Sequence, residues 1–432
     1  MDKIISYIIR FLIGGSRPGA ICAQVGYTAD VSKFGRYSVV IIPSTFFQND
    51  VYGTDASIPE LPLKEIEGTP LLFGTPDMEW VNGTLIIHAD IIASTYFLIS
   101  RYEEIRRRNV RDVYGRFPGK ESLPYRAGFI HRPVVDEYGK LLRKWLNEAG
   151  AQLSEPEQKI KKTWLTHDVD APFFCRSLRG VLRETFKKKN IKEALRIYKG
   201  KVEDDPYYTF PWLIEQNNIL KKRLGKSHCE SIFFVKGGGK SKQDKPAYNL
   251  YLPDMQTLLS LFNQKQAIIG LHSSFDAGKK PALISSELET LEKASKKNIQ
   301  YNRHHYLASR EPEDMDWLER AGITDDFTMG YADVSGFRLG TCRPVQWINP
   351  VTKRLSPLRL HPLTIMDCSL SEKKYMGLNY EQAQEYSLQL IKQVTQMNGE
   401  LVLLWHNTTV QDSTKCYHRT LYSFLLNELA AK

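Results

Sequence analysis

Two aspartates, Asp168 and Asp170, are the residues of this chain with the clearest chemical potential. They follow the apolar pair Trp164 and Leu165, so they lie at the tip of an expected buried strand. Alternate residues of a strand point to the same face, which places the two carboxylates on one face, about 7 Å apart. Two such anions repel each other unless a cation or a shared proton lies between them. The pair therefore predicts a metal site or two cooperating acids; a turn or helix cap at residues 169–172 is the alternative.

Further polar side chains end or follow the later apolar runs of the chain. Seven runs predict strands: residues 163–166, 231–235, 267–271, 299–306, 327–331, 363–366 and 401–405. The carboxyl ends of parallel strands meet at one rim of an α/β fold, so the groups that end such strands come together there. These groups are His272, Asp276, Arg303, His304, His305, Tyr306, Tyr331, Asp333, Asp367, His406 and Asn407. So many at one rim favour an active site over isolated structural histidines.

The residue types at this rim suit hydrolysis assisted by a metal. Aspartate and imidazole bind a divalent ion, which acidifies a water molecule and polarises a carbonyl group. A second aspartate within reach can take the proton of the water, and a histidine on the far side can protonate the leaving group. An arginine can orient the base or stabilise the oxyanion.

The elements that must position these residues alternate between strand and helix. Helical periodicity marks four stretches between the apolar runs: residues 252–264, 282–297, 313–321 and 380–397. Strands with intervening helices predict parallel βα units, arranged either as a barrel or as an open sheet. We expect this second domain to span residues 163–432, with a helical insertion at about 173–226. A polar linker, residues 151–162, precedes it.

Residues 1–150 predict a separate mixed α/β domain. Strands are expected at residues 38–43 and 70–74, and residues 79–87 place Asn-Gly between two apolar arms, which predicts a hairpin. Asp90 is the expected cap of a helix over residues 91–107, and another helix is expected at 134–147. Residues 1–13 are interpreted as a first helix, with a secretory signal as the alternative.

Composition limits the classes of function. The chain has 432 residues, a net charge of +10 and no long uncharged apolar run, so no transmembrane segment is expected. Cationic runs at residues 106–108, 187–189 and 221–223 lack interleaved aromatic residues, and we interpret them as solvated helix faces rather than a nucleic-acid site. Six scattered cysteines indicate a reducing compartment. With no convincing export signal, a cytoplasmic location is predicted.

Taken in order, these motifs resemble the polysaccharide deacetylase family, carbohydrate esterase family 4, in a subgroup with an extra N-terminal domain. Residues 166–170 read Thr-His-Asp-Val-Asp where the family usually has Thr-Phe-Asp-Asp-Gly, and residues 272–276 read His-Ser-Ser-Phe-Asp for His-Ser/Thr-x-x-His. Residues 303–306 keep the Arg and Tyr of Arg-x-Pro-Tyr, and residues 403–406 match Leu-x-Leu-His. Segments typical of the subgroup extend the resemblance over nearly the whole chain: residues 115–122, 327–333, 336–344 and 405–407.

The resemblance implies a distorted (β/α)7 barrel with an additional N-terminal mixed α/β domain. It also implies metal-dependent removal of an N- or O-acetyl group from a saccharide. Asp168 takes the position of the base, Arg303 holds it, and His406 is the candidate acid. The implied metal ligands are Asp170, His272 and Asp276, and the residues expected at the substrate or oxyanion site are Tyr306, Tyr331 and Trp405.

Asp276 stands where the family has its second histidine, which makes the ligand set harder and more anionic. Zinc remains the first expectation for the metal, with manganese, iron, cobalt and magnesium as alternatives. Asp276 could instead miss the metal and cap the next helix. In that case His305 or water must complete the set of ligands, or no metal is held.

Two other functions remain open at the level of the sequence. The altered second motif is compatible with a catalytically silent barrel that binds glycan in surface-polysaccharide assembly, and the same fold could hydrolyse non-sugar carbon–nitrogen bonds. The expected partner is an acetylated saccharide. In the N-terminal domain, residues 116–121 with Arg126, His131 and Arg132 could roof the barrel mouth and grip an anionic sugar, or form only a structural interface.

Overall fold

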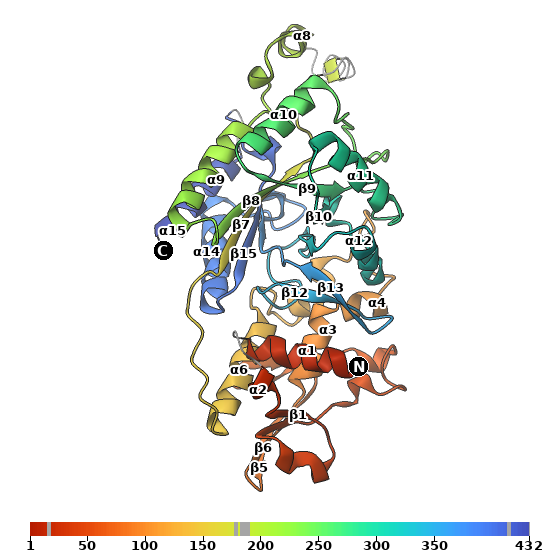
Figure 1. Ribbon diagram of the computed structural model, residues 1–432, viewed down its shortest axis with the longest axis vertical. Helices are drawn as coiled ribbons and strands as arrows, with labels where there is room; N and C mark the ends of the chain where they lie inside the picture. Colours follow the sequence, from red (N-terminus) through yellow and green to blue (C-terminus); the bar gives the residue numbers. More distant parts are fainter. Residues whose placement is uncertain (15–18, 177–179, 182–190, 413–415, 432) are drawn as a thin grey trace.

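A computed structural model describes residues 1–14, 19–176, 180–181, 191–412 and 416–431. It contains a four-stranded sheet near the N-terminus and a nine-stranded sheet in the rest of the chain, and the two lie at different levels along the long axis (Figure 1). The protein is therefore a mixed α/β protein. Below, residues 1–150 are called the N-terminal region.

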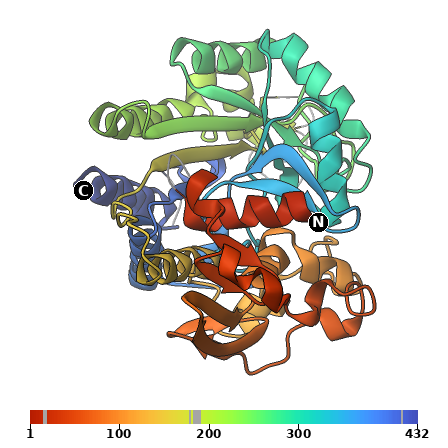
Figure 2. The ribbon, with the colours of Figure 1, turned by 60° about the horizontal axis from the view of Figure 1, so that its bottom comes forward.

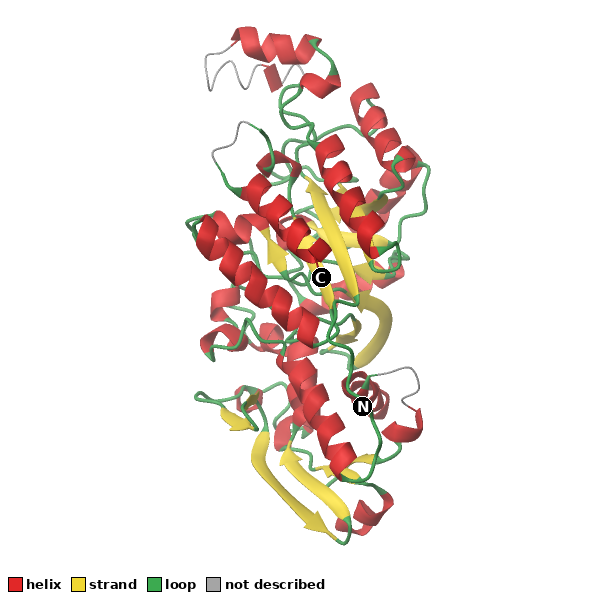
Figure 3. Ribbon diagram, turned by 90° about the vertical axis from the view of Figure 1, so that its left-hand side faces the viewer, coloured by secondary structure: helices red, strands yellow, loops and turns green. Residues whose placement is uncertain are grey.

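The small sheet has the strand order β1-β2-β6-β5, in which only β5 runs antiparallel to its neighbour. Its hairpin turns at Asn82 and Gly83, which have φ of 47° and 84°. This left-handed pair is the turn that Asn-Gly favours, so the predicted hairpin is confirmed. Figure 3 shows the hairpin at the far end of the molecule. The strands of the region are β1 Val25–Tyr27, β2 Val39–Ile41, β3 Lys64–Ile66, β4 Thr69–Leu71, β5 Gly74–Val81 and β6 Thr84–Ala89.

The predicted helix over residues 91–107 forms as two helices. Asp90 caps the first, accepting the Ala93 N–H at 2.9 Å, as expected from the sequence. Arg101 then adopts a left-handed conformation, φ 59°, which ends one helix and starts the next. Its buried guanidinium binds Glu104 and Ser309, contacts that no helical periodicity reveals. The helices are α1 Asp2–Ile13, α2 Gly19–Cys22, α3 Ile91–Ile99, α4 Tyr102–Arg106, α5 Leu123–Arg126 and α6 Val134–Glu148.

The large sheet has the order β12-β13-β11-β10-β9-β8-β7-β15-β14, and all of its pairs are parallel except β12 with β13. No ladder joins β12 to β14 within the described ranges, so the sheet is open in its strand order. Its strands are β7 Lys162–Val169, β8 Cys229–Val235, β9 Ile268–Ser273, β10 Tyr301–His304, β11 Asp325–Asp326, β12 Val345–Asn349, β13 Arg354–Leu360, β14 Ile365–Met366 and β15 Glu400–Leu404.

One strand prediction differs from the structure, and one hairpin was not predicted. The apolar run at residues 327–331 was expected to be a strand, but the strand there is β11, Asp325–Asp326, and the run follows it as a loop. Phe327 and Met329 are buried in the core, and this burial accounts for the apolar run without any pairing in a ladder. The hairpin β12–β13 was not predicted, and Pro357 within β13 weakens its strand signal.

Helices flank the large sheet, and α8 projects beyond its upper end (Figure 1). The expected helices at 252–264, 282–297 and 380–397 are confirmed as α10, α11 and α14. Of the insertion at 173–226, residues 177–179 and 182–190 lie outside the described residues, and the rest includes α8 and α9. The helices are α8 Ile191–Lys199, α9 Phe210–Leu224, α10 Pro253–Gln264, α11 Leu283–Ser295, α12 Asp316–Arg320, α13 Asp367–Ser371, α14 Tyr380–Gln396 and α15 His418–Ala431. Among the described helices, none has the length and apolar character needed to span a membrane.

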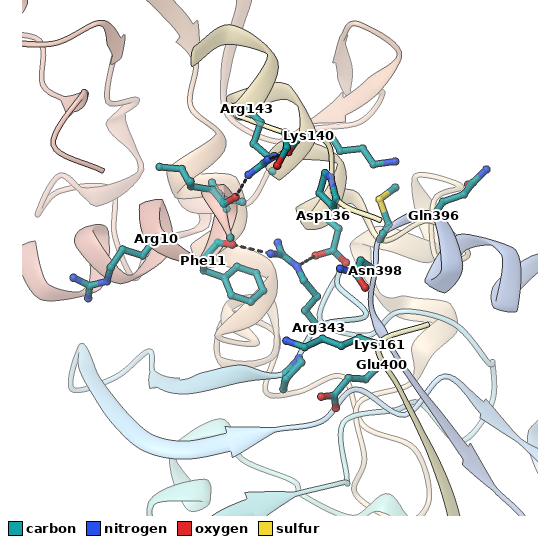
Figure 4. A pocket seen from close by; sticks show the side chains of 18 residues that line it. Arg10, Phe11, Asp136, Lys140, Arg143, Lys161, Arg343, Gln396, Asn398 and Glu400 are labelled. Carbon is teal, nitrogen blue, oxygen red and sulfur yellow. Dashed lines mark hydrogen bonds and ion pairs between the residues drawn. The ribbon is translucent and has the colours of Figure 1, made fainter. Parts of the chain in front are cut away.

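The N-terminal region packs directly against the large sheet, with α1 lying between the two (Figure 2). Arg343, which precedes β12, links two helices of the N-terminal region. Its Nη1 donates to the Phe11 carbonyl of α1 at 2.8 Å, and its Nε donates to Asp136 of α6 at 2.6 Å (Figure 4). Arg143 donates to the Ile13 carbonyl at 2.6 Å, so two arginines satisfy free carbonyls at the C-terminal end of α1. Buried apolar side chains of both parts form one continuous cluster.

Candidate metal centre and active site

Asp170, His272 and His305 form a group whose possible ligand atoms all lie within 4.8 Å of one another. Asp170 follows β7, His272 belongs to β9 and His305 follows β10, so the ends of three strands of the large sheet supply the group. The Asp170 Oδ1 lies 3.1 Å from the His272 Nε2 and 3.2 Å from the His305 Nε2. The structure thus contains a candidate metal-binding group at the carboxyl rim predicted from the sequence.

The partners of the two imidazoles suit them to act as metal ligands. The His272 Nδ1 lies 2.9 Å from the Arg303 carbonyl, and the His305 Nδ1 lies 2.9 Å from Asp244 Oδ1. Both partners are acceptors, so each Nδ1 can donate to its partner, and a ring that gives up its other proton to a metal offers a lone pair on Nε2. Both Nε2 atoms face Asp170. This arrangement, with an oxygen behind each ligating imidazole, is typical of metal centres.

The electrostatics of Asp170 also favour a cation. Burial acts to raise the pKa of its carboxyl group, but His305 and His272 outweigh that effect and hold the pKa well below its ordinary value. Its side chain is 34% exposed, which leaves the carboxylate accessible from the solvent side. Asp170 is therefore an ionised, accessible oxygen ligand beside two nitrogen ligands, a set that fits a divalent metal.

Asp168 lies next to this group but has a different partner. Its Oδ1 accepts a hydrogen bond from Arg303 Nη1 at 3.0 Å, and its Oδ2 lies 3.6 Å from His272 Nε2. Arg303 is fully buried, and its Nη1 and Nε are fixed by Thr166 Oγ1 at 2.8 Å and the Phe327 carbonyl at 3.0 Å. Asp168 is thereby held in one orientation, as a base must be.

His406 approaches Asp170 from the opposite direction, with its Nε2 3.7 Å from Asp170 Oδ2. Its Nδ1 lies 2.8 Å from Asp367 Oδ1, and its backbone N–H donates to Asp367 Oδ2 at 2.9 Å. Burial lowers the pKa of His406, but the Asp367 carboxylate outweighs burial and raises the pKa well above its ordinary value. Asp367 therefore favours the protonated form of the ring, which suits an acid. Cys368 lies beside it, and burial raises the pKa of its thiol to about 12.

These groups open into a cavity of about 240 Å³. Asp168, Asp170, His305, Tyr306 and His406 line it, and the N-terminal region adds Tyr114 and Arg116 to its wall. The charged groups and the cavity coincide, so the site can receive a ligand as well as hold a metal.

Of the residues predicted for the site, the structure brings together Asp168, Asp170, His272, Arg303, Tyr306 and His406. It departs from the expectation for Asp276, whose Oδ2 accepts the N–H groups of Lys240 and Ser241 at 2.7 and 2.9 Å. Asp276 thus braces a loop and does not cap the next helix. His305, the alternative raised from the sequence, stands beside Asp170 instead.

The structure also departs from the substrate roles expected for Tyr331 and Trp405. Trp405 is fully buried, with its Nε1 bound to the His418 carbonyl at 3.0 Å. Tyr331 packs against Phe117 and Val334, outside the cavity that holds the charged groups. Both follow strands in the sequence, but their rings point into apolar packing, which strand-end position alone does not reveal.

Two residues at the site had no predicted role. Asp244, behind His305, lies in a loop after β8 and had no motif to mark it. Asp367, behind His406, was noted only as a strand-end group, although a carboxylate following a strand beside the predicted acid is a usable signal.

Comparisons with known proteins give limited matches. Residues 20–151 match the sequence model of a family of unknown function, DUF7033. No curated protein matches the chain. Among solved structures, the chain is similar to a "putative polysaccharide deacetylase" from Mycobacterium smegmatis, with 14% sequence identity, a TM-score of 0.40, and coverage of 65% of this chain and 88% of that one.

Proposed function

We propose that the protein is a metal-dependent hydrolase that removes an acetyl group from a saccharide. The observation that carries the proposal is the convergence of Asp170, His272 and His305, with an acceptor oxygen behind each imidazole. The resemblance of the strand-end motifs to polysaccharide deacetylases supplies the substrate class. A distorted (β/α)7 barrel belongs to the proposal. The rings of Trp164 in β7 and Phe327 after β11 lie 5.2 Å apart although three strands separate β7 from β11 in the sheet, which supports a strongly curved sheet.

A divalent ion held by Asp170, His272 and His305 would polarise the acetyl carbonyl and acidify a water molecule. Asp168, oriented by Arg303, takes the proton of the attacking water. The bond between the carbonyl carbon and the sugar nitrogen or oxygen then breaks, and His406 gives its proton to that leaving atom. Acetate and a free amine or hydroxyl group result. The backbone of Tyr306, at the wall of the cavity, is the proposed site for the developing oxyanion.

Metal content and acetate release test the proposal together. The purified full-length protein should contain one divalent ion per chain by elemental analysis, and should release acetate from N- or O-acetylated oligosaccharides. Chelation should abolish the release and added metal restore it. Metal and saccharide binding without any acetate release would favour a silent glycan-binding protein, and release from small non-sugar amides alone would favour the other hydrolase.

Asp168→Asn separates catalysis from metal binding. The variant keeps the ligand group but loses the proton acceptor, so we expect kcat to fall by about 10²–10⁴-fold with the metal content unchanged. Full activity in this variant would contradict the role of Asp168 as base.

A further inference from the structure

A loop of the N-terminal region, residues 112–120, reaches the mouth of the proposed active site. Tyr114 and Arg116 of this loop line the same cavity as Asp168 and Asp170, although more than fifty residues separate them in sequence. The loop is braced internally: Asp112 Oδ1 accepts the N–H groups of Tyr114 and Arg116, both at 2.9 Å. It therefore presents its side chains to the site from a fixed backbone.

Arg116 makes the central contact of the loop. It is 7% exposed, and its guanidinium is held by Asp112 Oδ2, to which Nε donates at 2.8 Å. The guanidinium also reaches two segments outside the loop: Nη1 donates to the Tyr306 carbonyl at 2.9 Å and Nη2 to the Tyr375 hydroxyl at 3.2 Å. With one edge anchored, the planar guanidinium holds its other donors in a fixed orientation, which the flexible side chain of a lysine does not.

The residue that Arg116 holds has a strained backbone. Tyr306 has φ of 62° and the following Leu307 has φ of 52°, in the left-handed region that side chains other than glycine disfavour. Such a conformation persists only where the surrounding structure imposes it. Tyr306 directly follows the ligand candidate His305, so the position of this turn affects both the metal group and the proposed oxyanion site.

The same loop holds other segments around the mouth. The backbone N–H groups of Gly119 and Lys120 bind the Asp333 carboxylate at 2.8 and 3.1 Å, and Lys120 Nζ binds the Tyr375 carbonyl at 2.9 Å. The Tyr114 ring packs on that of Tyr306, with centroids 5.0 Å apart. Three separate segments of the rim thus depend on one loop from the other end of the chain.

We propose that the N-terminal region completes the active site, and that Arg116 is a positioning residue that holds the Tyr306 turn in its catalytic conformation. The expected effect of Arg116 on catalysis rests on the proposed function. Its expected effect on the conformation of the Tyr306 turn does not. It gives the segment at residues 115–122 a role in the site, whereas Arg126 and Arg132 bind carboxylates of the N-terminal region itself.

The first test needs no substrate. Amide hydrogen exchange of a peptide covering residues 303–310 should be at least tenfold faster in Arg116→Met than in the wild-type full-length protein, and intermediate in Arg116→Lys. Arg132→Met, which removes an arginine bound to Glu137 and the Gly68 carbonyl, is the matched control and should leave this exchange unchanged. Equal exchange in wild type and Arg116→Met, with both folded by circular dichroism, would overturn the proposal.

The second test uses glycine, which adopts positive φ without steric cost. In the wild-type background, Arg116→Met should lower kcat for acetate release by tenfold or more, with metal content retained. In a Tyr306→Gly background the same change should lower kcat by less than threefold, because the turn no longer needs to be forced. An equal loss in both backgrounds would show that Arg116 acts in another way and would overturn the positioning role.

The two tests separate failure of the inference from failure of the proposed function. If the wild-type protein releases no acetate, the proposed function fails, while the exchange experiment still decides whether Arg116 holds the turn. If acetate is released and exchange is unaffected by Arg116→Met, the function stands and the inference fails.

Discussion

At the scale of single residues, the candidate centre is defined as much by the atoms behind the ligands as by the ligands themselves. Asp244 fixes the proton of His305 on Nδ1, and the Arg303 carbonyl does the same for His272. His305 further lowers the pKa of Asp244 to about 2, although burial acts in the opposite direction. The Asp244 carboxylate therefore stays ionised at any pH at which the site could bind a metal.

Replacing His305 and Asp276 in turn identifies the third ligand. His305→Ala should lower metal affinity by at least the 10–100-fold that loss of a supporting partner costs. Asp276→Asn should keep both metal and activity, because its carboxylate binds only backbone N–H groups of the described loop. Calorimetric titration with zinc or cobalt measures the metal affinity of both variants. Loss of metal in Asp276→Asn with retention in His305→Ala would reverse the assignment.

The pH dependence of the reaction should report the pair of His406 and Asp367. A general acid works only while protonated, so kcat/KM falls as the pH rises through the pKa of His406. Asp367→Asn removes the negative charge that raises this pKa and leaves burial, which lowers it. The alkaline limb of the kcat/KM profile should therefore move to lower pH. Asp276→Asn is the control and should keep the alkaline limb of the wild-type protein. If the limb of Asp367→Asn is also unchanged, another group donates the proton.

The sequence predicts which of these side chains belong to the site only where they lie at the ends of strands. Asp168, Asp170, His272 and His406 each follow or end an apolar run, and parallel pairing brings such residues to one rim. The choice between Asp276 and His305 could not be made in this way, because both lie near strand ends. It depends on Lys240 and Ser241, whose N–H groups bind Asp276 from a loop that carries no motif.

At the scale of elements, a buried histidine links the first residues of two strands of the large sheet. His361, at the end of β13, is buried between Asp325 of β11 and Glu400 of β15, with ring nitrogens 2.9 and 2.8 Å from their oxygens. Burial lowers the pKa of His361, but hydrogen bonds to the two carboxylates outweigh it and raise the pKa. The same contact lowers the pKa of Asp325 to about 2. One imidazolium thus links two strands that are far apart in the order of the sheet.

This link predicts a defined dependence of stability on pH. Because the folded-state pKa of His361 is raised, its contribution is fully present below the unfolded value of about 6.5 and disappears as pH rises through the folded value. His361→Gln leaves two carboxylates facing each other, and we expect a loss of about 3–5 kcal/mol near pH 6. Urea unfolding between pH 5 and 9 should show the difference from wild type shrinking as pH rises.

The exposed His228 provides the control for that experiment. His228→Gln should leave both the unfolding free energy and its slope with pH close to wild type, because its ring binds only the Lys161 carbonyl at the surface. A difference between wild type and His361→Gln that stays constant over the whole pH range would contradict a charged His361.

Elements with clear local signals were predicted well, and those decided by distant contacts were not. Asn82 and Gly83 determine their hairpin within a few residues. The break at Arg101 depends on Ser309, more than two hundred residues away, so the periodicity of the helix predicts no break.

At the scale of the whole molecule, a buried cluster of charges joins the N-terminal region to the large sheet. Glu104 of α4 accepts hydrogen bonds from Arg101 and, at 2.8 and 3.1 Å, from Arg338. Burial acts to raise the pKa of Glu104, but the two guanidinium groups outweigh burial and lower it. Residues 336–344 supply Arg338 to this cluster and Arg343 to the separate contact with Phe11 and Asp136.

Removing the central anion should destabilise the whole protein. Glu104→Gln leaves two buried guanidinium groups without a counter-charge, and we expect a loss of about 3–5 kcal/mol in unfolding free energy. Glu104→Gln combined with Arg338→Met should recover part of the loss, since one unpaired cation is gone. Glu148→Gln, at a surface pair, should change the free energy by at most about 1 kcal/mol. A Glu104→Gln protein as stable as the Glu148→Gln control would contradict the account.

The position of β12 has a consequence for how the chain is made. This antiparallel strand forms one edge of the large sheet, and α3 lies against it. Because ribosomes deliver the N-terminal residues first, α3 and its neighbours have time to fold before β12 emerges. The apolar residues of β12 can then pack as soon as the strand emerges, which shortens the time during which they are exposed to other chains.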